Sequence, residues 1–174
     1  ELASMKVYQE VDALVTMNVN TTMGLAHHFG RGMKARGRGG MILVSSGACY
    51  GGLHGIAAYC AAKGFVLNFA EALWAELRHD GVDVLTLVLG RTDTPSHRKI
   101  LEESGQAVPE DMATPEEVAE VGLRQLPHGP IWNWGQPNDV AGMAPNSPDQ
   151  RRAKIVMIEQ MSAAYTNRTE EQPA

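Results

Sequence analysis

The chain has 174 residues, a hydrophobic content of 44% and a formal net charge of −5. This size and composition predict one domain around an ordinary buried core, which excludes wholesale disorder. The acidic balance argues against a nucleic acid or an anionic membrane as the main partner. No run approaches the roughly 18 apolar residues that a membrane span needs.

The start of the chain and its cysteines bear on the compartment in which the protein works and on whether the chain is a fragment. A signal peptide is not predicted, because the start, ELASMKVYQE, lacks a basic segment followed by an apolar one. Position 1 is not methionine, so we expect a fragment, a processed product or a stretch of a longer protein. Cys49 and Cys60 fit neither a disulfide framework nor a metal pattern and are expected to be reduced thiols. We therefore expect a cytoplasmic protein with a single domain over residues 1–165 and a disordered tail over 166–174.

The first predicted element is a long helix over residues ~9–34, where apolar side chains recur with helical spacing. A glycine-rich segment that begins at Gly37 ends it. The apolar run at ~41–45 is bounded by glycine and predicts a buried strand of a parallel sheet. The glycine content of residues 47–55 predicts a loop.

A second long helix is expected over residues ~57–78, because alanine, leucine and glutamate favour helices and Gly81 stands just past its end. The apolar run at 82–89 predicts another strand. This alternation of helices and strands indicates crossover connections, a parallel sheet and the α/β fold class.

The later segments carry weaker signals. Residues 91–113 are polar and weakly periodic, which predicts a flexible loop or lid. A helix is expected at 114–126, since Thr-Pro followed by two glutamates is a good helix start. The segment IWNWG, which begins at Ile131, predicts a last strand, and residues ~148–164 predict a final helix.

Tyr59 and Lys63 form a Y-x-x-x-K pair on the second predicted helix. Residues i and i+4 share one face of a helix, with Cβ atoms about 5–6 Å apart. A free tyrosine has a pKa of about 10, and a nearby ammonium lowers such a pKa because it stabilises the phenolate. Ser46 lies thirteen residues before the tyrosine, at the end of the first predicted strand. Its hydroxyl can hold a substrate oxygen outside the carboxyl ends of the strands, where open parallel sheets bind ligands.

Each of these residues also has an ordinary structural explanation. A Y-x-x-x-K pair occurs by chance in many helices, and a serine after a strand commonly serves a turn. An asparagine within a helix, such as Asn18, usually has no catalytic role. The joint pattern of strand, serine, tyrosine, lysine and a further strand ending in glycine is what favours chemistry.

Two other kinds of site are disfavoured. His27 and His28 are neighbours in a helix and face different directions, and His54 stands alone in a glycine-rich loop, so no metal site is expected. A serine hydrolase is disfavoured because Val44 stands where G-x-S-x-G would need a glycine before Ser46.

With these residues the sequence resembles the short-chain dehydrogenase/reductase family. The resemblance covers residues ~10–127 and rests on MNVN, GGMILVSS, the YCAAK helix, VDVLTLVLGRTDT and TPEEVAEVGL. It implies a Rossmann-like, doubly wound parallel sheet. It also implies reversible hydride transfer between a nicotinamide cofactor, NAD or NADP, and a small-molecule alcohol or ketone.

The resemblance implies a role for each residue of the pattern. Tyr59 would be the catalytic acid/base, and Lys63 would bind the nicotinamide ribose and support the tyrosine's charged form. Ser46 would orient the substrate oxygen. Asn18 would hold a water that links Lys63 to a proton relay.

The segment after the second strand departs in part from the family pattern. Leu89 stands where the family usually has proline, so the fixed φ of proline is lost and a looser loop is expected. Gly90 would let the backbone pass close to the nicotinamide. Thr94 would contact the cofactor amide or diphosphate, and Arg91, at a commonly apolar position, would alter cofactor or substrate contacts.

The larger departure is the family's glycine-rich turn, T-G-x-x-x-G-x-G, which is absent together with the N-A-G segment. Residues 30–35 fit G-x-G-x-x-A but lie at the end of a helix and before a strand, the reverse of the context that a dinucleotide turn needs. We therefore expect an N-terminally truncated Rossmann-like domain that binds cofactor poorly on its own.

Two functional hypotheses follow. The first is an oxidoreductase, or the catalytic portion of one. The alternative is a non-catalytic or truncated relative that serves as an oligomerisation or partner-binding module. The family's two long helices, here ~9–34 and ~57–78, commonly pair with their copies, which implies a homodimer or homotetramer. The complete set of asparagine, serine, tyrosine and lysine favours catalysis, because a scaffold has no physical need for all four.

Overall fold

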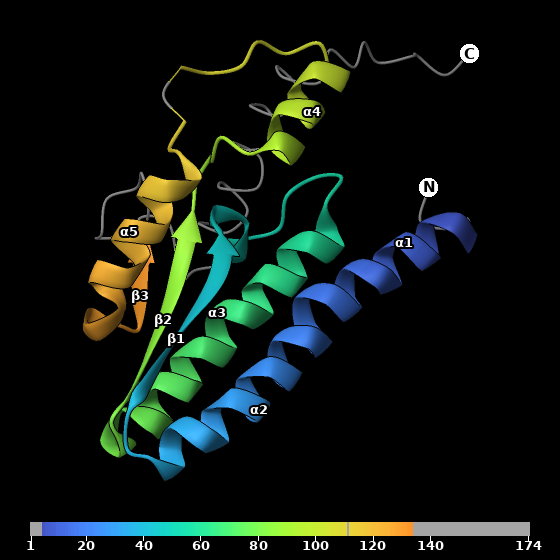
Figure 1. Ribbon diagram of the computed structural model, residues 1–174. Helices are drawn as coiled ribbons and strands as arrows, with labels where there is room; N and C mark the ends of the chain where they lie inside the picture. The colour runs from blue at the N-terminus through green and yellow to red at the C-terminus, as the bar shows by residue number, and fades with distance from the viewer. Residues whose placement is uncertain (1–4, 111, 134–174) are drawn as a thin grey trace, which may run out of the picture.

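The structure is a computed structural model that describes residues 5–110 and 112–133. Its described part is a three-stranded parallel sheet in the order β1-β2-β3, with helices on both faces (Figure 1). The strands are β1 (Gly39–Ser46), β2 (Val82–Leu89) and β3 (Ile131–Asn133). β1 and β2 pair along their whole length, with Ser46 opposite Leu89. The predicted α/β class with a parallel sheet is confirmed.

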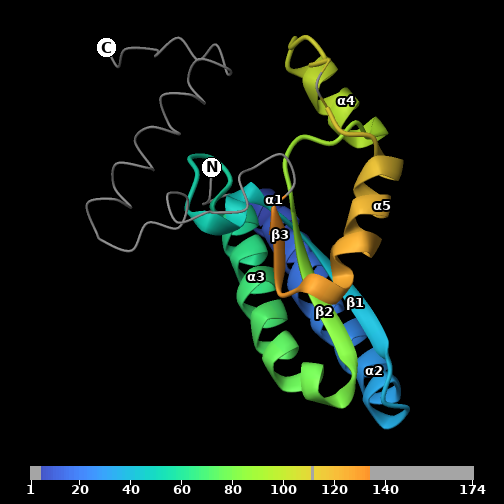
Figure 2. The same cartoon turned by 90° about the vertical axis from the view of Figure 1, so that its left-hand side faces the viewer.

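One face of the sheet is covered by a long helical rod and by α3 (Figures 1 and 2). The rod consists of α1 (Met5–Val15), a π turn (Thr16–Asn20) and α2 (Thr21–Ala35). α3 (Ala57–Leu77) runs beside it and continues into a 3₁₀ turn (Arg78–Asp80). The second long helix agrees with its predicted range. The first ends where predicted but begins at Met5, four residues earlier than expected, and contains a π turn that the sequence did not predict.

The opposite face is covered by α5 (Pro115–Gln125), which leads through a 3₁₀ turn (Leu126–His128) into β3. α5 packs closely at Gly122, where an added Cβ would lie 3.0 Å from the Leu87 side chain of β2. Thr114 begins the helix with a capping box, in which its hydroxyl and the Glu117 carboxylate each accept from the other residue's backbone N–H.

The core is centred on β2, the middle strand. Val82, Val84, Leu85 and Val88 are each 0% exposed. A strand covered by helices on both faces has little room for polar side chains, which explains the nearly continuous apolar sequence of residues 82–89. This strand matches its predicted limits at both ends.

Two predicted loops contain helical structure. Residues 47–55 begin with a 3₁₀ turn (Gly47–Tyr50). The prediction of a loop over residues 91–113 is wrong in part, because α4 (Pro95–Glu103) lies within it. The periodicity is weak because α4 buries only Leu101, yet it starts with Thr-Pro, the same signal that correctly predicted α5.

Several predictions lie outside the described residues. These are the final helix at ~148–164, the tail at 166–174, the domain limit at 165 and the end of the IWNWG segment. Within residues 5–110 and 112–133, β1 pairs only with β2, so its other edge is open. No helix in that part of the chain has the length and apolar character required to cross a bilayer.

Candidate active site

The predicted site residues gather at the carboxyl end of the sheet. β1 ends at Ser46, and the chain then turns through Gly47–Tyr50 before it enters α3, which carries Tyr59 and Lys63. α4 lies beyond the ends of β1 and β2 (Figure 1). This arrangement fits the rule that ligands bind outside the carboxyl ends of parallel strands.

Lys63 contacts both the Tyr59 ring and the end of β1. Its Nζ lies 5.6 Å from the centre of the Tyr59 ring and donates a hydrogen bond of 3.3 Å to the carbonyl of Val44 in β1. The buried hydroxyl of Ser45 donates to the Lys63 carbonyl at 3.1 Å, which fixes this turn of α3 against β1. The ammonium is therefore within cation–π distance of the aromatic ring.

Burial lowers the pKa of Lys63 from its ordinary value, and the nearby Cys49 opposes this effect. The cause is the partial removal of the ammonium from water, which penalises its charged form. A poorly hydrated cation interacts more strongly with a neighbouring anion, because less of its field is screened. Lys63 is thus suited to stabilise negative charge at Tyr59.

Ser46 has a structural role in addition to its predicted one. Its Oγ accepts a hydrogen bond of 3.3 Å from the N–H of Ala48 and so caps the 3₁₀ turn. A hydroxyl can donate one hydrogen bond and accept two. The cap uses one acceptor position, so the hydroxyl hydrogen can still be donated to a substrate oxygen.

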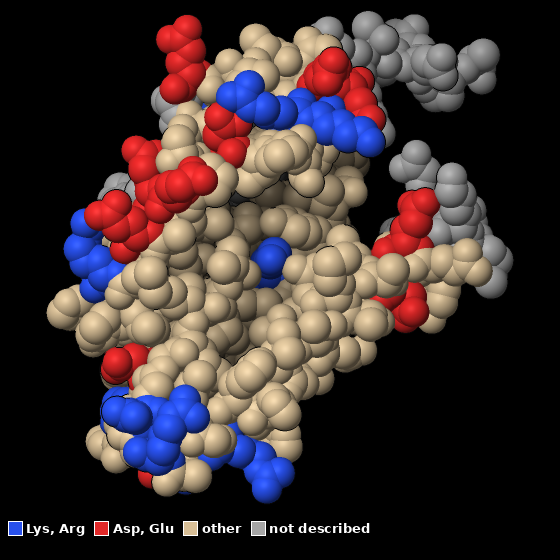
Figure 3. Space-filling model, in the orientation of Figure 1, with Lys and Arg blue, Asp and Glu red and all other residues tan. Residues whose placement is uncertain are grey.

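Asn18 lies in the π turn between α1 and α2, and its side-chain amide donates to the Leu14 carbonyl at 3.0 Å. π turns are rare within helices and are often found at functional sites. Asn18 and Lys63 both line a groove of about 440 Å³ between α2, β1 and α3. Figure 3 shows a hollow on this face with a basic side chain inside it, and Lys63 is the one basic residue among those that line the groove.

The groove is otherwise mainly apolar. It is lined from α2 and the π turn, from β1 and from α3, by Met17, Asn18, Thr22, Leu25, Ala26, Phe29, Met33, Gly40, Met41, Ile42, Leu43, Val44, Lys63 and Val66. Leu25 and Phe29 are each 53% exposed. The structure thus brings Asn18 and Lys63 to one apolar groove, and the water relay between them stays a prediction.

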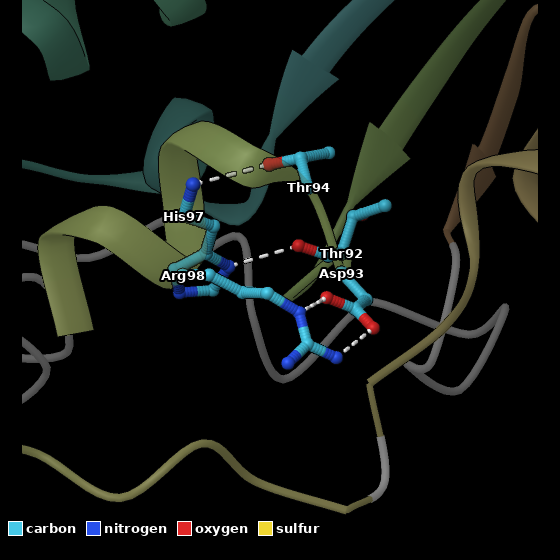
Figure 4. Close-up of polar contacts among 5 residues, drawn as sticks. All are labelled: Thr92, Asp93, Thr94, His97 and Arg98. Carbon is cyan, nitrogen blue, oxygen red and sulfur yellow. Dashed lines mark hydrogen bonds and ion pairs between the residues drawn. The ribbon is translucent and has the colours of Figure 1, made fainter. Parts of the chain in front are cut away.

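The predicted cofactor residues after β2 lie at the same end of the sheet. Gly90 and Arg91 are exposed directly beyond Leu89, the residue that pairs with Ser46. The Thr94 hydroxyl accepts from the backbone N–H of His97 at 3.2 Å and caps α4 (Figure 4). Contact between Thr94 and a cofactor stays a prediction.

Sequence reasoning missed the contacts that fix the base of α4 (Figure 4). Arg98 donates from two nitrogens to the Asp93 carboxylate, with Nη2 and Oδ2 2.6 Å apart, and lowers the pKa of that carboxyl. The His97 ring lies 3.0 Å from the Thr92 carbonyl. The Thr-Pro helix start, with an aspartate before it and an arginine after it, was the signal that could have located them.

Sequence reasoning also missed a buried hydrogen bond beside Ser46. The Tyr50 hydroxyl donates to Oδ1 of Asn133 at 2.6 Å, and the two residues are 8% and 5% exposed. Burial raises the pKa of Tyr50 to about 12. No sequence signal links two residues that lie 83 positions apart.

Comparisons with known proteins agree on one family. The family model described as short chain dehydrogenase matches residues 2–105. A 7beta-hydroxysteroid dehydrogenase of Collinsella aerofaciens is 34% identical over 121 residues, which cover 68% of this chain and 46% of that protein. The chain therefore spans about half the length of the curated relatives it matches.

Two solved structures show the same fold. The structure described in a study of 7beta-hydroxysteroid dehydrogenase stereoselectivity is 32% identical, with a TM-score of 0.64 over 80% of this chain and 56% of the other. A short chain dehydrogenase from Burkholderia cenocepacia in complex with NADP is 23% identical, with a TM-score of 0.67 over 85% of this chain and 58% of the other. At that identity the second structure supports the fold alone.

Proposed function

This chain belongs to the short-chain dehydrogenase family, and from that premise we propose that it carries the proton-transfer site of an NAD(P)-dependent oxidoreductase that interconverts an alcohol and a ketone. The observation that carries the proposal is the position of the Lys63 ammonium, 5.6 Å from the centre of the Tyr59 ring. Ser46 ends the strand whose Val44 carbonyl binds the same ammonium.

Each of the four residues has its own role in the proposed proton transfer. When a ketone is reduced, the Tyr59 phenol gives its proton to the oxygen that becomes the alcohol, and Lys63 stabilises the phenolate that is left. When an alcohol is oxidised, the phenolate takes that proton back. Ser46 holds the same oxygen by a hydrogen bond from its hydroxyl, and Asn18 holds a water on the route by which Tyr59 exchanges protons with solvent.

A nicotinamide cofactor would supply or accept the hydride at the carbonyl carbon. The residues at the carboxyl end of the sheet fit its nicotinamide and ribose portion. Lys63 offers a donor to ribose hydroxyls, and the exposed Gly90 and Arg91 stand next to Ser46 across the pair of strands. We propose that Thr94 contacts the cofactor through the oxygen that also caps α4.

The substrate class is proposed from the relatives. Those similar to this chain include proteins named 7beta-hydroxysteroid dehydrogenase from Collinsella aerofaciens and Mediterraneibacter gnavus. A hydroxylated steroid and its ketone are therefore the first substrate pair to test. A secondary alcohol on a rigid apolar ring also fits a site in which one lysine lies within an apolar groove.

One observation favours the alternative function, a partner-binding or oligomerisation module. Met17, Leu25 and Phe29 are 67%, 53% and 53% exposed on the helical rod, and they line the apolar groove. We propose that the long helices also mediate a homodimer or homotetramer, and that the protein works in the cytoplasm. Assembly and catalysis are compatible, and the cofactor titration below tests the first function on its own.

The proposal is tested by a fluorescence titration of the purified chain with NADPH and, separately, with NADH. We expect weak but saturable binding that Lys63→Ala weakens further. Lys99→Ala is the matched control, because the Lys99 side chain is 73% exposed on α4. Equal affinity in both variants would remove Lys63 from the cofactor site. A folded chain that binds neither cofactor would mean that the residues of this chain do not form a working cofactor site by themselves.

A further inference from the structure

The buried pair Tyr50–Asn133 joins the two outer strands of the described sheet at its carboxyl end. Tyr50 ends the turn that directly follows Ser46 and β1, and Asn133 is the last residue of β3. Since β2 lies between these strands, the hydrogen bond passes across the end of the central strand. We propose that this pair is a positioning device that holds the Ser46 hydroxyl in place for Tyr59.

The turn between Ser46 and Tyr50 links the Tyr50–Asn133 hydrogen bond to the position of Ser46. At the start of the turn, the Ser46 hydroxyl accepts from the N–H of Ala48, a residue that is 7% exposed. At the end of the turn, the side chain of Tyr50 is buried in the core. The turn also lies on α3, where the carbonyl of Cys49 is 3.7 Å from the place of a Cβ on Gly64. The serine and the helix that carries Tyr59 and Lys63 are therefore held by one short segment.

The Tyr50–Asn133 hydrogen bond is expected to persist across the physiological pH range. Because burial raises the pKa of Tyr50 to about 12, its phenol stays protonated across the physiological range and donates to the Asn133 oxygen. A separation of 2.6 Å is short for an O–H···O bond between neutral groups. With its hydroxyl donated to Asn133, Tyr50 is assigned a structural role, distinct from the proton transfer proposed for Tyr59.

The inference rests on the proposed function, and its test has one measurement that does not depend on activity. In Tyr50→Phe the Asn133 carbonyl is left buried without its donor, so the turn should open more often. We expect amide hydrogen–deuterium exchange of residues 47–56 to become about tenfold faster, the equivalent of an ordinary buried hydrogen bond. Tyr8→Phe is the matched control, because Tyr8 is 63% exposed on α1.

Steady-state kinetics on the steroid ketone then separate positioning from stability. We expect Tyr50→Phe to lower kcat about 10- to 100-fold, as a small misplacement of a substrate-orienting group does, with little change in cofactor affinity. The double variant Tyr50→Phe/Asn133→Leu replaces both partners by apolar groups, which is often nearly neutral for stability. It should recover the thermal stability of the wild type while its kcat stays low.

Each outcome decides the inference. Unchanged exchange of residues 47–56 in Tyr50→Phe would overturn the anchoring role, whatever the activity. A double variant with wild-type kcat would reduce the pair to a stabilising contact. If Tyr50→Phe does not fold, the kcat of the double variant decides the inference. A wild type without turnover would contradict the proposed function only, and the exchange data would then decide the anchoring by themselves.

Discussion

Replacing Lys63 by methionine removes the ammonium and keeps a side chain of similar length. If the 5.6 Å between the Lys63 ammonium and the centre of the Tyr59 ring is taken as the charge separation, with an effective dielectric constant of ~20, the ammonium stabilises the Tyr59 phenolate by about 3 kcal/mol. A loss of this size in the transition state lowers the rate about 100-fold. We therefore expect kcat/KM for alcohol oxidation to fall by about two orders of magnitude in Lys63→Met.

The same substitution should not destabilise the fold. Burial lowers the pKa of Lys63 below its ordinary 10.5, so in the wild type folding is penalised while the ammonium is charged. Between the pKa of Lys63 in the folded protein and its ordinary value of 10.5, the unfolded chain binds the Lys63 proton and the folded chain has lost it. The free energy of unfolding of the wild type therefore rises with pH across this range. Lys63→Met lacks this penalty and should be at least as stable as the wild type at neutral pH, with the difference shrinking above the folded pKa.

The assay combines initial rates with thermal denaturation at pH 7 and at alkaline pH. Lys99→Met is the matched control, since the Lys99 side chain is 73% exposed and pairs only loosely with Glu103. It should change neither quantity. A Lys63→Met enzyme with rates within a few-fold of wild type, or with a Tm several degrees lower at pH 7, would refute the reasoning.

Three further predictions concern single residues. Tyr59→Phe should abolish turnover and leave cofactor affinity nearly intact, because it removes only the hydroxyl that carries the transferable proton. Turnover is measured beside the cofactor titration, and turnover that survives the substitution would remove Tyr59 from its role. Leu85→Ala should lower the free energy of unfolding by about 2–5 kcal/mol, since Leu85 is 0% exposed in β2; a loss below 1 kcal/mol in urea denaturation would mean that the site collapses around the smaller side chain. Thr114→Ala should cost about 1 kcal/mol by removing the cap of α5, and an equal loss in Thr114→Ser, which keeps a capping hydroxyl, would argue against the cap.

The sequence predicted those parts of the fold whose signals are local. The strand at 82–89 was found at both ends because helices cover both of its faces, which requires an unbroken apolar run. α3 and α5 were found because strong helix formers and a Thr-Pro start are local signals. α4 was missed because it buries a single apolar residue, so helical periodicity had little to repeat.

The spacing of the candidate residues could be interpreted from the sequence, whereas their contacts could not. The spacing of Tyr59 and Lys63 predicted their shared helix face, and the structure places the ammonium within reach of the ring. The capping roles of Ser46 and Thr94 depend on backbone N–H groups whose positions follow from the folded turns. The Tyr50–Asn133 bond is a tertiary contact, and its partners become neighbours only once three strands are aligned.

Among residues 5–110 and 112–133, β1 pairs on one side only, and this has a consequence for the behaviour of concentrated solutions. Its sequence, GGMILVSS, contains no charged residue and no proline, the two features by which edge strands usually resist aggregation. Val44 on this strand is 49% exposed. Wherever this edge stays uncovered, it is a template on which strands of further copies can add, so we expect self-association of the purified chain to rise with its concentration.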